Sequence, residues 1–266
     1  MAHSVNATLS LDALAQEYVG PYMEIYFKKI TTWQLHHVIA FAVVVTAAAE
    51  FLTQLLHTLS AAATRLPMNP KQHLDKLEAR DKTFIFINKV LMVTFMYHMC
   101  QLLTAMPGTK WKVEEATLSN TLLPLIPMYL IFDFFYASFH KLLHLRSIYG
   151  YIHKHHHRQV SPTRGHYDAI NVHPFEFFVG EYLHLVCFWA VPCHIFGIGL
   201  FMLGAVTAAT FNHMRFDWCI PGVYDSKDHL VHHRVPDANF GQYTMFWDKL
   251  FGWHRSYSDT HAGKTS

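Results

Sequence analysis

The sequence predicts an all-α integral membrane protein, in which about three transmembrane helices plus a helical hairpin support a cytosolic helical cap with a His-rich dinuclear metal site. Three observations predict this fold class. Of the 266 residues, 52% are hydrophobic and only 15% are charged, which is too apolar for ordinary soluble domains. Several apolar segments are long enough to cross a bilayer. Sixteen of the 22 histidines lie from His140 onward, mostly in short groups beside those segments.

Composition excludes other classes of protein. A formal net charge of +2 on scattered basic residues does not form the surface that nucleic-acid binding needs. The four cysteines lack paired spacing, so neither a disulfide framework nor a CxxC zinc site is predicted. The chain does not open with the pattern of a cleaved signal peptide, so we expect internal segments to direct membrane insertion.

Three apolar segments, residues 33–59, 83–106 and 118–138, are predicted to be transmembrane helices. Each is long enough, because a hydrocarbon core of about 30 Å needs roughly 20 helical residues. Polar side chains inside the first two segments are costly in hydrocarbon, so we expect them to face protein rather than lipid. These polar residues are Glu50, Asn88 and Lys89.

A fourth apolar region, residues 177–211, is predicted to be a helical hairpin. Pro192, Gly197 and Gly199 near its middle favour a break between two helices. At a rise of about 1.5 Å per residue, the whole region spans only about 50 Å, which is short of two full crossings. We therefore expect a shallow or tilted hairpin that returns to its starting face.

These elements divide the remaining chain between the two membrane faces. Sixteen of the 21 lysine and arginine residues fall on one face and four on the other. The positive-inside rule predicts that the basic face is cytosolic. The sequon at Asn6 would lie on the opposite face, although so short a pattern is usually accidental. The basic face comprises residues 60–82, 139–176 and 212–266, and the other comprises residues 1–32 and 107–117.

The histidines of the cytosolic segments form four groups. Positions four apart share one face of a helix, so His140 and His144 can reach one metal region. The stretch HKHHH, residues 153–157, contains an HxxHH pattern that predicts a helical face with three ligands and leaves His155 pointing elsewhere. A single histidine and a second HxxHH pattern follow. The predicted metal ligands are His140, His144, His153, His156, His157, His213, His229, His232 and His233.

Nine imidazoles are too many for one ion and suit two, because non-haem iron takes up to six ligands and needs an open position for oxygen. Imidazoles are neutral, so we expect nearby carboxylates to hold ring N–H groups. Asp217 ranks first because it lies four residues after His213 and could bind metal or metal-bound water, and we predict a catalytic role for it. The other acidic candidates are Asp133, Asp168, Glu176 and Asp228.

The order of these motifs resembles the integral-membrane fatty acid hydroxylase and sterol desaturase superfamily. The stretch NVHPFEFF resembles the HPxE segment of that family, and HLVHHRVPDANFGQYTMFWDKLFGW resembles its closing signature. The resemblance covers about residues 120–255. Asp217 stands where acyl-chain and sphingolipid hydroxylases have a second histidine, which is more like the sterol-oxidising branch.

The resemblance implies a membrane-bound di-iron monooxygenase of the endoplasmic reticulum, with the metal site facing the cytosol. Such an enzyme uses two iron ions and O2, and receives electrons from NAD(P)H through a carrier such as cytochrome b5, which we expect to be a separate protein. Lys154, Arg158 and Arg164 could receive an acidic carrier, or simply follow the positive-inside bias. We divide the chain into a membrane anchor region, residues 1–117, and a catalytic region, residues 118–266, integrated with the membrane helices.

The expected reaction is hydroxylation of an unactivated C–H bond of a lipid of sterol or fatty acyl type. Desaturation by the same kind of centre is the alternative within the superfamily. A non-catalytic metal-binding or metal-transporting membrane protein is the alternative from another class, although a transporter would place its ligands near the middle of the membrane.

Several further residues have two interpretations. His173 in HPFE either acts near the metals or caps the hairpin, and we include it among the predicted catalytic residues. His184 could line the substrate path, although a buried, hydrogen-bonded histidine is the simpler interpretation. His155 and His166 are expected to face solvent. The residues predicted to pack the C-terminal segment beneath the site are Trp247, Asp248 and Phe251.

Overall fold

A computed structural model of the chain describes residues 30–67 and 76–261, so the sequon at Asn6 lies outside the described residues. Four of the described segments are long and apolar enough to cross a membrane. The three predicted spans are confirmed, and most of their predicted ends lie within a few residues of the observed ends. The all-α class is also confirmed. The four segments are Leu35–Ala62, Ala79–Ala105, Leu118–Leu143 and Ile195–Asn212.

The first three segments contain the helices that precede the hairpin. Helix α3 is Leu35–Leu59, followed by a 3-10 turn at Ser60–Ala62, and α4 is Ala79–Ala105. The third segment is divided into a short α5, Leu118–Thr121, and a long α6, Leu125–Leu143. Pro124 stands at the N-cap of α6, where a missing N–H costs nothing.

The hairpin consists of α9, Pro174–Ala190, and α10, Ile195–Asn212, with the break at Pro192 that the sequence predicts. Gly197 and Gly199 lie inside α10, so their assignment to the break was wrong. Gly197 has a packing role instead, because a Cβ at this position would lie 2.8 Å from the Thr121 carbonyl oxygen. Glycine therefore allows α10 to approach α5 closely.

The hairpin is not shallow. Its tip forms strand β2, Cys193–His194, which pairs in parallel with β1, Thr109–Lys110, between α4 and α5. The tip therefore reaches the ends of α4 and α6 that are remote from the histidines. The prediction underestimated the depth because it compared the total length with two full crossings, whereas each arm of 17 or 18 residues reaches about 26 Å by itself.

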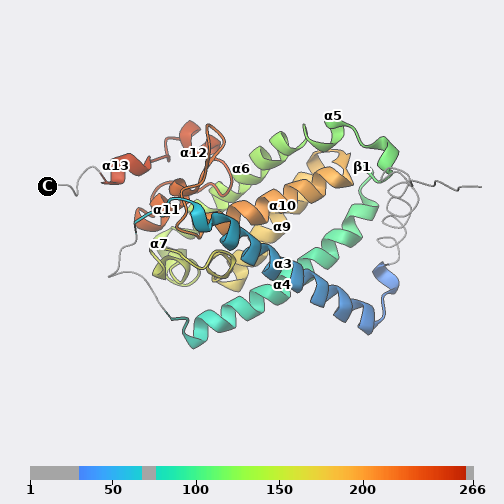
Figure 1. Cartoon of the computed structure of the whole chain (residues 1–266), viewed down its shortest axis with the longest axis horizontal. Helices are drawn as coiled ribbons and strands as arrows, with labels where there is room; N and C mark the ends of the chain where they lie inside the picture. The colour runs from blue at the N-terminus through green and yellow to red at the C-terminus, as the bar shows by residue number, and fades with distance from the viewer. Residues whose placement is uncertain (1–29, 68–75, 262–266) are drawn as a thin grey trace, which may run out of the picture.

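The packed core lies between α4, α6, α9 and α10. Helix α9 packs against both α4 and α6, and α6 also packs against α10. Figure 1 shows α6, α9 and α10 running side by side, with α4 running in the same general direction and α3 crossing in front of them. The core is rich in aromatic and sulfur-containing side chains, among them Phe95, Met128, Phe132 and Phe201.

The polar residues of the first two spans face protein, as predicted. The Asn88 amide donates hydrogen bonds to the carbonyl oxygens of Ile170 and Val172, at 2.8 and 2.9 Å. Lys89 forms an ion pair with Glu50 of α3, and the Tyr167 hydroxyl donates to the other oxygen of Glu50 at 2.7 Å. These contacts connect α3, whose surface is otherwise largely exposed, to α4 and to the cap.

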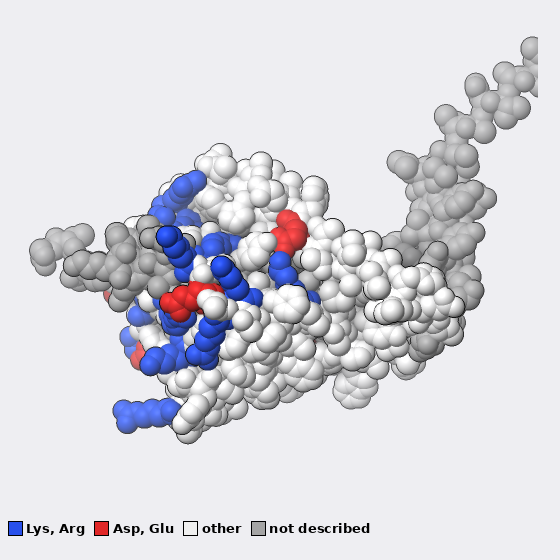
Figure 2. Space-filling view, turned by 90° about the horizontal axis from the view of Figure 1, so that it is seen from below, with Lys and Arg blue, Asp and Glu red and all other residues white. Residues whose placement is uncertain are grey.

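The cap gathers at one end of the bundle (Figure 1). Lysine and arginine side chains crowd the same end of the face seen in Figure 2, and most of the remaining described surface in that view is uncharged. This distribution agrees with the predicted division of charge, while the cytosolic orientation stays a prediction. The cap elements are α7 Arg146–Tyr149, η6 His156–Arg158, α8 His166–Ala169, β3 Cys219–Ile220, β4 Tyr224–Asp225, α11 Ser226–Arg234, α12 Phe246–Leu250 and α13 Tyr257–His261.

Candidate metal centre

The structure brings all nine predicted histidine ligands together in two groups. Within each group the candidate ligand atoms lie within 4.8 Å of one another. Most of these side chains are buried at the junction between the membrane helices and the cap. The five-histidine group is His140, His144, His153, His157 and His232, and the four-histidine group is His156, His213, His229 and His233.

Each HxxHH motif divides its histidines between the two groups. In the first motif His153 and His157 join the five-histidine group, and His156 joins the four-histidine group. In the second motif, on α11, His229 and His233 form an i, i+4 pair and His232 belongs to the other group. The two motifs therefore bridge both groups, which fixes the groups side by side.

The stretch HKHHH does not form the regular helical face that the sequence predicts. Residues 153–155 form a turn, and His156 begins the 3-10 helix η6. The second motif divides in the same way on the regular helix α11, so the split does not depend on the helix type. In both motifs the i, i+4 pair stays together and the i+3 histidine joins the other group.

Helix ends position two of the predicted ligands. His144 is the C-cap of α6 and His213 is the C-cap of α10. Both imidazoles therefore stand where the membrane helices end and the cap begins. A metal centre at this position lies at one end of the spans and not halfway along them.

Backbone carbonyl groups fix the tautomers of several imidazoles. Nδ1–H of His140 donates to the carbonyl oxygen of Phe240 at 2.9 Å. Nδ1–H of His232 donates to Ala238 at 2.7 Å, and Nδ1–H of His213 donates to Ala209 at 2.8 Å. Because a neutral imidazole has one N–H, the Nε2 atoms of these three residues present lone pairs to the interior of their groups.

The facing Nε2 atoms have the chemistry of metal ligands. His140 Nε2 lies 3.0 Å from His153 Nε2, and Nδ1 of His153 lies 2.8 Å from a Glu176 oxygen. With both Nδ1 protons directed outward, neither Nε2 atom has a proton to share, and two lone pairs at this distance repel each other. A cation between the rings removes this repulsion, so the residues fit two bound metal ions.

Burial keeps these imidazoles neutral. It lowers the pKa of His144 to about 4 and that of His157 to about 3. Burial, followed by the neighbouring imidazoles, also holds the pKa of His156, His229 and His233 well below the usual range. Neutral imidazole is the form that binds metal.

Glu176 is the one acidic candidate that contacts an imidazole of either group among the described residues. It is buried on α9, and its Oε1 accepts the Nδ1–H of His153. Burial raises the pKa of Glu176. Divalent cations bound nearby would lower this pKa again, because they stabilise the charged carboxylate. The sequence ranked Asp217 above Glu176 because separation along the chain does not show which carboxylate the α9 helix delivers to the site.

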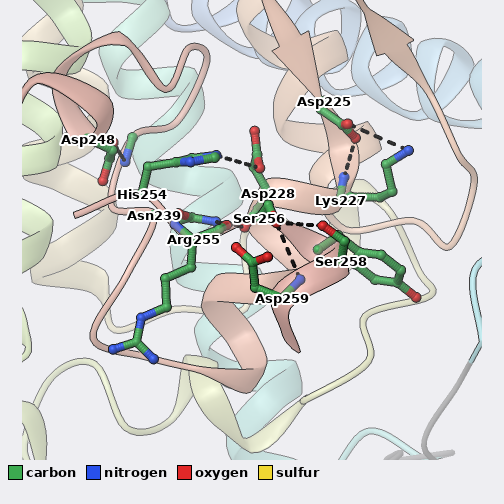
Figure 3. Close-up of polar contacts among 12 residues, drawn as sticks. Asp225, Lys227, Asp228, Asn239, Asp248, His254, Arg255, Ser256, Ser258 and Asp259 are labelled. Atoms are coloured by element: carbon green, nitrogen blue, oxygen red, sulfur yellow. Dashed lines mark hydrogen bonds and ion pairs between the residues drawn. The ribbon is translucent and has the colours of Figure 1, made fainter. Parts of the chain in front are cut away.

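The other acidic candidates have different partners. Asp168 accepts from the backbone N–H groups of Thr163 and Arg164, at 2.9 Å each. Asp228 on α11 lies 3.2 Å from His254, and Figure 3 shows this contact. His254 belongs to neither group. Asp133 binds backbone N–H groups of the C-terminal loop.

Asp217 and His173, the two predicted catalytic residues, lie outside both groups. Asp217 forms an ion pair with Lys227 at 2.8 Å, and its side chain is 32% exposed. His173 is the N-cap of α9, where its Nδ1 accepts the backbone N–H of Phe175 at 3.2 Å. The capping interpretation of His173 therefore matches the structure, and the bonds of Asp217 hold it in a loop of the cap.

His155 and His166 are buried, so the prediction that they face solvent was wrong. His155 Nε2 lies 2.9 Å from the Asn171 amide oxygen and 3.0 Å from an Asp81 oxygen. His166 lies on α8, next to the residues that contact α3 and α4. The His155 side chain connects the cap to α4 through Asp81, and His166 lines the cavity described below.

An apolar cavity of about 390 Å³ extends from the four-histidine group between α3, α9 and α10. His156, His213 and His229 line its metal end, and no residue of the five-histidine group is among its described lining residues. Its walls also include Val44 and Leu203, which are 65% and 49% exposed on the apolar outer surface. The cavity therefore connects the four-histidine group with the surface that membrane lipid would cover.

Comparison with known proteins identifies the segment that contains the site. Residues 125–253, which include all nine histidines, match the family model described as fatty acid hydroxylase. This segment is similar to the fatty acid hydroxylase family. No solved structure is significantly similar to the chain.

Relatives of the chain include proteins named for sterol oxidation. A cholesterol 25-hydroxylase-like protein of Caenorhabditis elegans is 29% identical over 164 residues, which is 58% of this chain and 53% of that protein. Lathosterol oxidase of Rattus norvegicus is 30% identical over 119 residues, covering 42% and 38% of the two chains. The chain thus spans about half the length, or less, of these two relatives. Their names support the predicted sterol-oxidising branch.

A third relative has a different name. A very-long-chain aldehyde decarbonylase of Oryza sativa subsp. indica is 24% identical over 205 residues, covering 70% of this chain and 76% of that protein. Proteins named hydroxylase, oxidase and decarbonylase are thus all similar to this chain, and similarity alone does not select one reaction.

The closing signature of the fatty acid hydroxylase segment has a structural role, as the sequence predicts. Asp248 accepts the backbone N–H groups of Phe240 and Gly241, at 2.6 and 2.9 Å. The Trp247 indole N–H donates to the Leu130 carbonyl oxygen of α6 at 2.7 Å. These bonds hold the loop whose Phe240 carbonyl fixes the tautomer of His140.

Proposed function

We propose that the protein is a membrane-bound di-iron monooxygenase that uses O2 and reducing equivalents to hydroxylate an unactivated C–H bond of a lipid, of sterol or fatty acyl type. The observation that supports this most strongly is the pair of buried imidazole groups beside an apolar cavity that opens on the lipid-facing surface. Bound iron would supply the activation of O2 and the removal of hydrogen from the C–H bond.

The protein's own residues would divide the work between the two groups. The four-histidine group has fewer ligands and lines the cavity, so its ion would have open positions facing the lipid. The five-histidine group is separated from the cavity, and its His153 is held by Glu176. The apolar walls would exclude water and position the carbon to be oxidised.

The proposed location is the endoplasmic reticulum membrane, with the metal centre facing the cytosol. Electrons would come from NAD(P)H through a separate carrier such as cytochrome b5. The basic residues at the cap end suit an acidic carrier, although Arg158 and Arg164 already form ion pairs with Asp81 and Asp168. Lys154 is exposed and is the more accessible of the predicted contacts.

Desaturation of the same lipid is the second candidate reaction, because removal of a second hydrogen gives a double bond in place of an alcohol. A metal transporter is the alternative from another class. Its ligands would be expected near the middle of the spans, whereas His144 and His213 stand at helix ends. This placement favours the enzyme.

Lipid analysis of cells with and without the gene tests the proposed activity. We expect one lipid to gain an oxygen atom when the wild type is expressed, and no such gain with His156→Ala expressed at the same level. A product that has lost two hydrogen atoms would assign desaturation. An unchanged lipid profile, or the same product from His156→Ala, would reject the catalytic proposal.

A further inference from the structure

One face of α9 lines the cavity with three polar side chains. Glu176, Gly180, Glu181 and His184 are all lining residues, and their spacing of about four places them along one side of the helix. Glu176 reaches the metal centre through His153. Glu181 and His184 lie further along α9, in a part of the cavity whose other walls are mainly apolar.

Glu181 is half-buried and lines the cavity, and its carboxyl group has no hydrogen-bond or ion-pair partner among residues 30–67 and 76–261. Its backbone carbonyl is engaged, because it accepts Nδ1–H of His184 at 2.8 Å. A carboxyl group that faces an apolar cavity without a partner is costly once lipid fills the cavity, and the cost is reduced when the ligand supplies a donor.

The second polar element of this region is a bond between His184 and Tyr243. Since the Nδ1–H of His184 is used, its Nε2 accepts, and the Tyr243 hydroxyl donates to it at 2.9 Å. The Tyr243 oxygen keeps lone-pair capacity toward the cavity, where Glu181 is an electrostatic neighbour. Tyr243 is also held in place, because its backbone N–H donates to Asp133 at 3.0 Å.

We propose that Glu181, with the His184 and Tyr243 pair, forms a hydroxyl-binding subsite in the cavity, and that the substrate is a lipid alcohol. This rests on the proposed oxidation of a lipid at the metal centre. The substrate O–H donates to the Glu181 carboxylate, beside the Tyr243 hydroxyl group. The remaining lipid occupies the apolar walls.

The subsite also sets where oxidation takes place. Glu181 is five residues beyond Glu176, which places it roughly 8 Å further from the metal end along the α9 axis. A substrate whose hydroxyl group is held at Glu181 therefore presents to the four-histidine group a carbon several bonds away from that hydroxyl. The hydroxyl group already present in the substrate would therefore determine which carbon is oxidised.

Binding measurements on the purified full-length protein in detergent test the subsite without turnover. The probes are tritiated cholesterol with cholesteryl methyl ether as competitor, and octadecan-1-ol with its methyl ether. Etherification removes the O–H donor and keeps the rest of the lipid. A hydrogen bond to a charged group is worth about 1.5–3 kcal/mol, so we expect at least one alcohol to bind about 10-fold or more tightly than its ether.

Glu181→Leu should abolish this preference by weakening the alcohol and leaving the ether unchanged, and Glu181→Gln should retain part of it. Met202→Leu alters the cavity wall without changing its polarity and should keep the preference. Equal affinity for alcohol and ether in both pairs, or a preference that survives in Glu181→Leu, would overturn the proposal. If Glu181→Leu does not fold, the wild-type ratio and Glu181→Gln decide. Metal content is measured on the same samples, so loss of the subsite is distinguished from loss of the metal centre.

Discussion

Glu176 accepts a hydrogen bond from His153 Nδ1–H across 2.8 Å, and this contact joins the cavity-lining face of α9 to the five-histidine group. The carboxylate fixes the tautomer of His153 and directs its Nε2 toward His140 and His157. Glu176 therefore influences a metal centre without belonging to either group of imidazoles.

Replacing Glu176 should weaken metal binding. Glu176→Gln removes the negative charge and permits the opposite tautomer of His153, and loss of such partners typically costs about 10–100-fold in metal affinity. Competition against a chelator, followed by metal analysis of the protein, measures the change. Asp217→Asn is the matched control, because its partner Lys227 lies in the cap, and it should keep its metal. If Asp217→Asn loses metal and Glu176→Gln does not, the assignment of the supporting carboxylate is reversed.

Adjacent histidines in HKHHH should respond differently to alanine. His156→Ala removes a ligand of the four-histidine group, so we expect loss of metal and of activity. His155→Ala removes bonds to Asn171 and Asp81 and should lower the free energy of unfolding by about 1–3 kcal/mol while the folded protein keeps its metal. Thermal denaturation and metal content on both variants check this. Equal metal loss in the two variants would contradict the division.

Stability of the metal-free protein should fall with acidity. Burial lowers the pKa of His157 to about 3, so its imidazole stays neutral in the folded state when the unfolded chain becomes protonated near pH 6.5. The unfolded state then binds more protons, and stability is lost as the pH falls from about 6.5 toward 3, by at most about 1.4 kcal/mol per pH unit for this group. Thermal midpoints between pH 7.5 and 5 measure the slope. A midpoint that is flat or rises over this range would contradict the burial of neutral imidazoles.

The ion pair between Glu50 and Lys89 should be needed to hold α3 against α4. Glu50→Gln leaves the Lys89 ammonium without its charge partner inside a span, which costs about 3 kcal/mol. The double variant Glu50→Gln with Lys89→Met removes both charges and should recover most of the loss. A double-mutant cycle of thermal stability in detergent measures the coupling. Strictly additive effects would show that the pair does not join the helices.

The spans, the break at Pro192 and the nine histidines were accessible from sequence because each depends on local pattern. Apolar length defines a membrane helix, and Pro192 disrupts one wherever it occurs. Gly197 was misread because its role is a close contact with Thr121, which only the packing of α10 on α5 reveals.

The partition of the imidazoles and the choice of carboxylate depend on the tertiary structure. His156 separates from His153 and His157 because it meets His213, which comes from another segment of the chain. His232 separates from its neighbours on α11 in the same way, by meeting His157. Glu176 reaches His153 because α9 packs along α6, and no distance along the chain encodes that contact. Glu181 was missed for a similar reason, since its neighbours in the cavity come from distant segments.

Iron analysis of the purified protein, combined with O2-dependent turnover, tests the central claim most directly. The two imidazole groups predict two irons per chain and a lipid product whose formation requires both O2 and a reductant. The variant His229→Ala with His233→Ala, which empties half of the four-histidine group, should retain at most one iron and form no product. A protein that binds only zinc, or that holds two irons yet oxidises no lipid alcohol, sterol or acyl lipid, would contradict the proposed function.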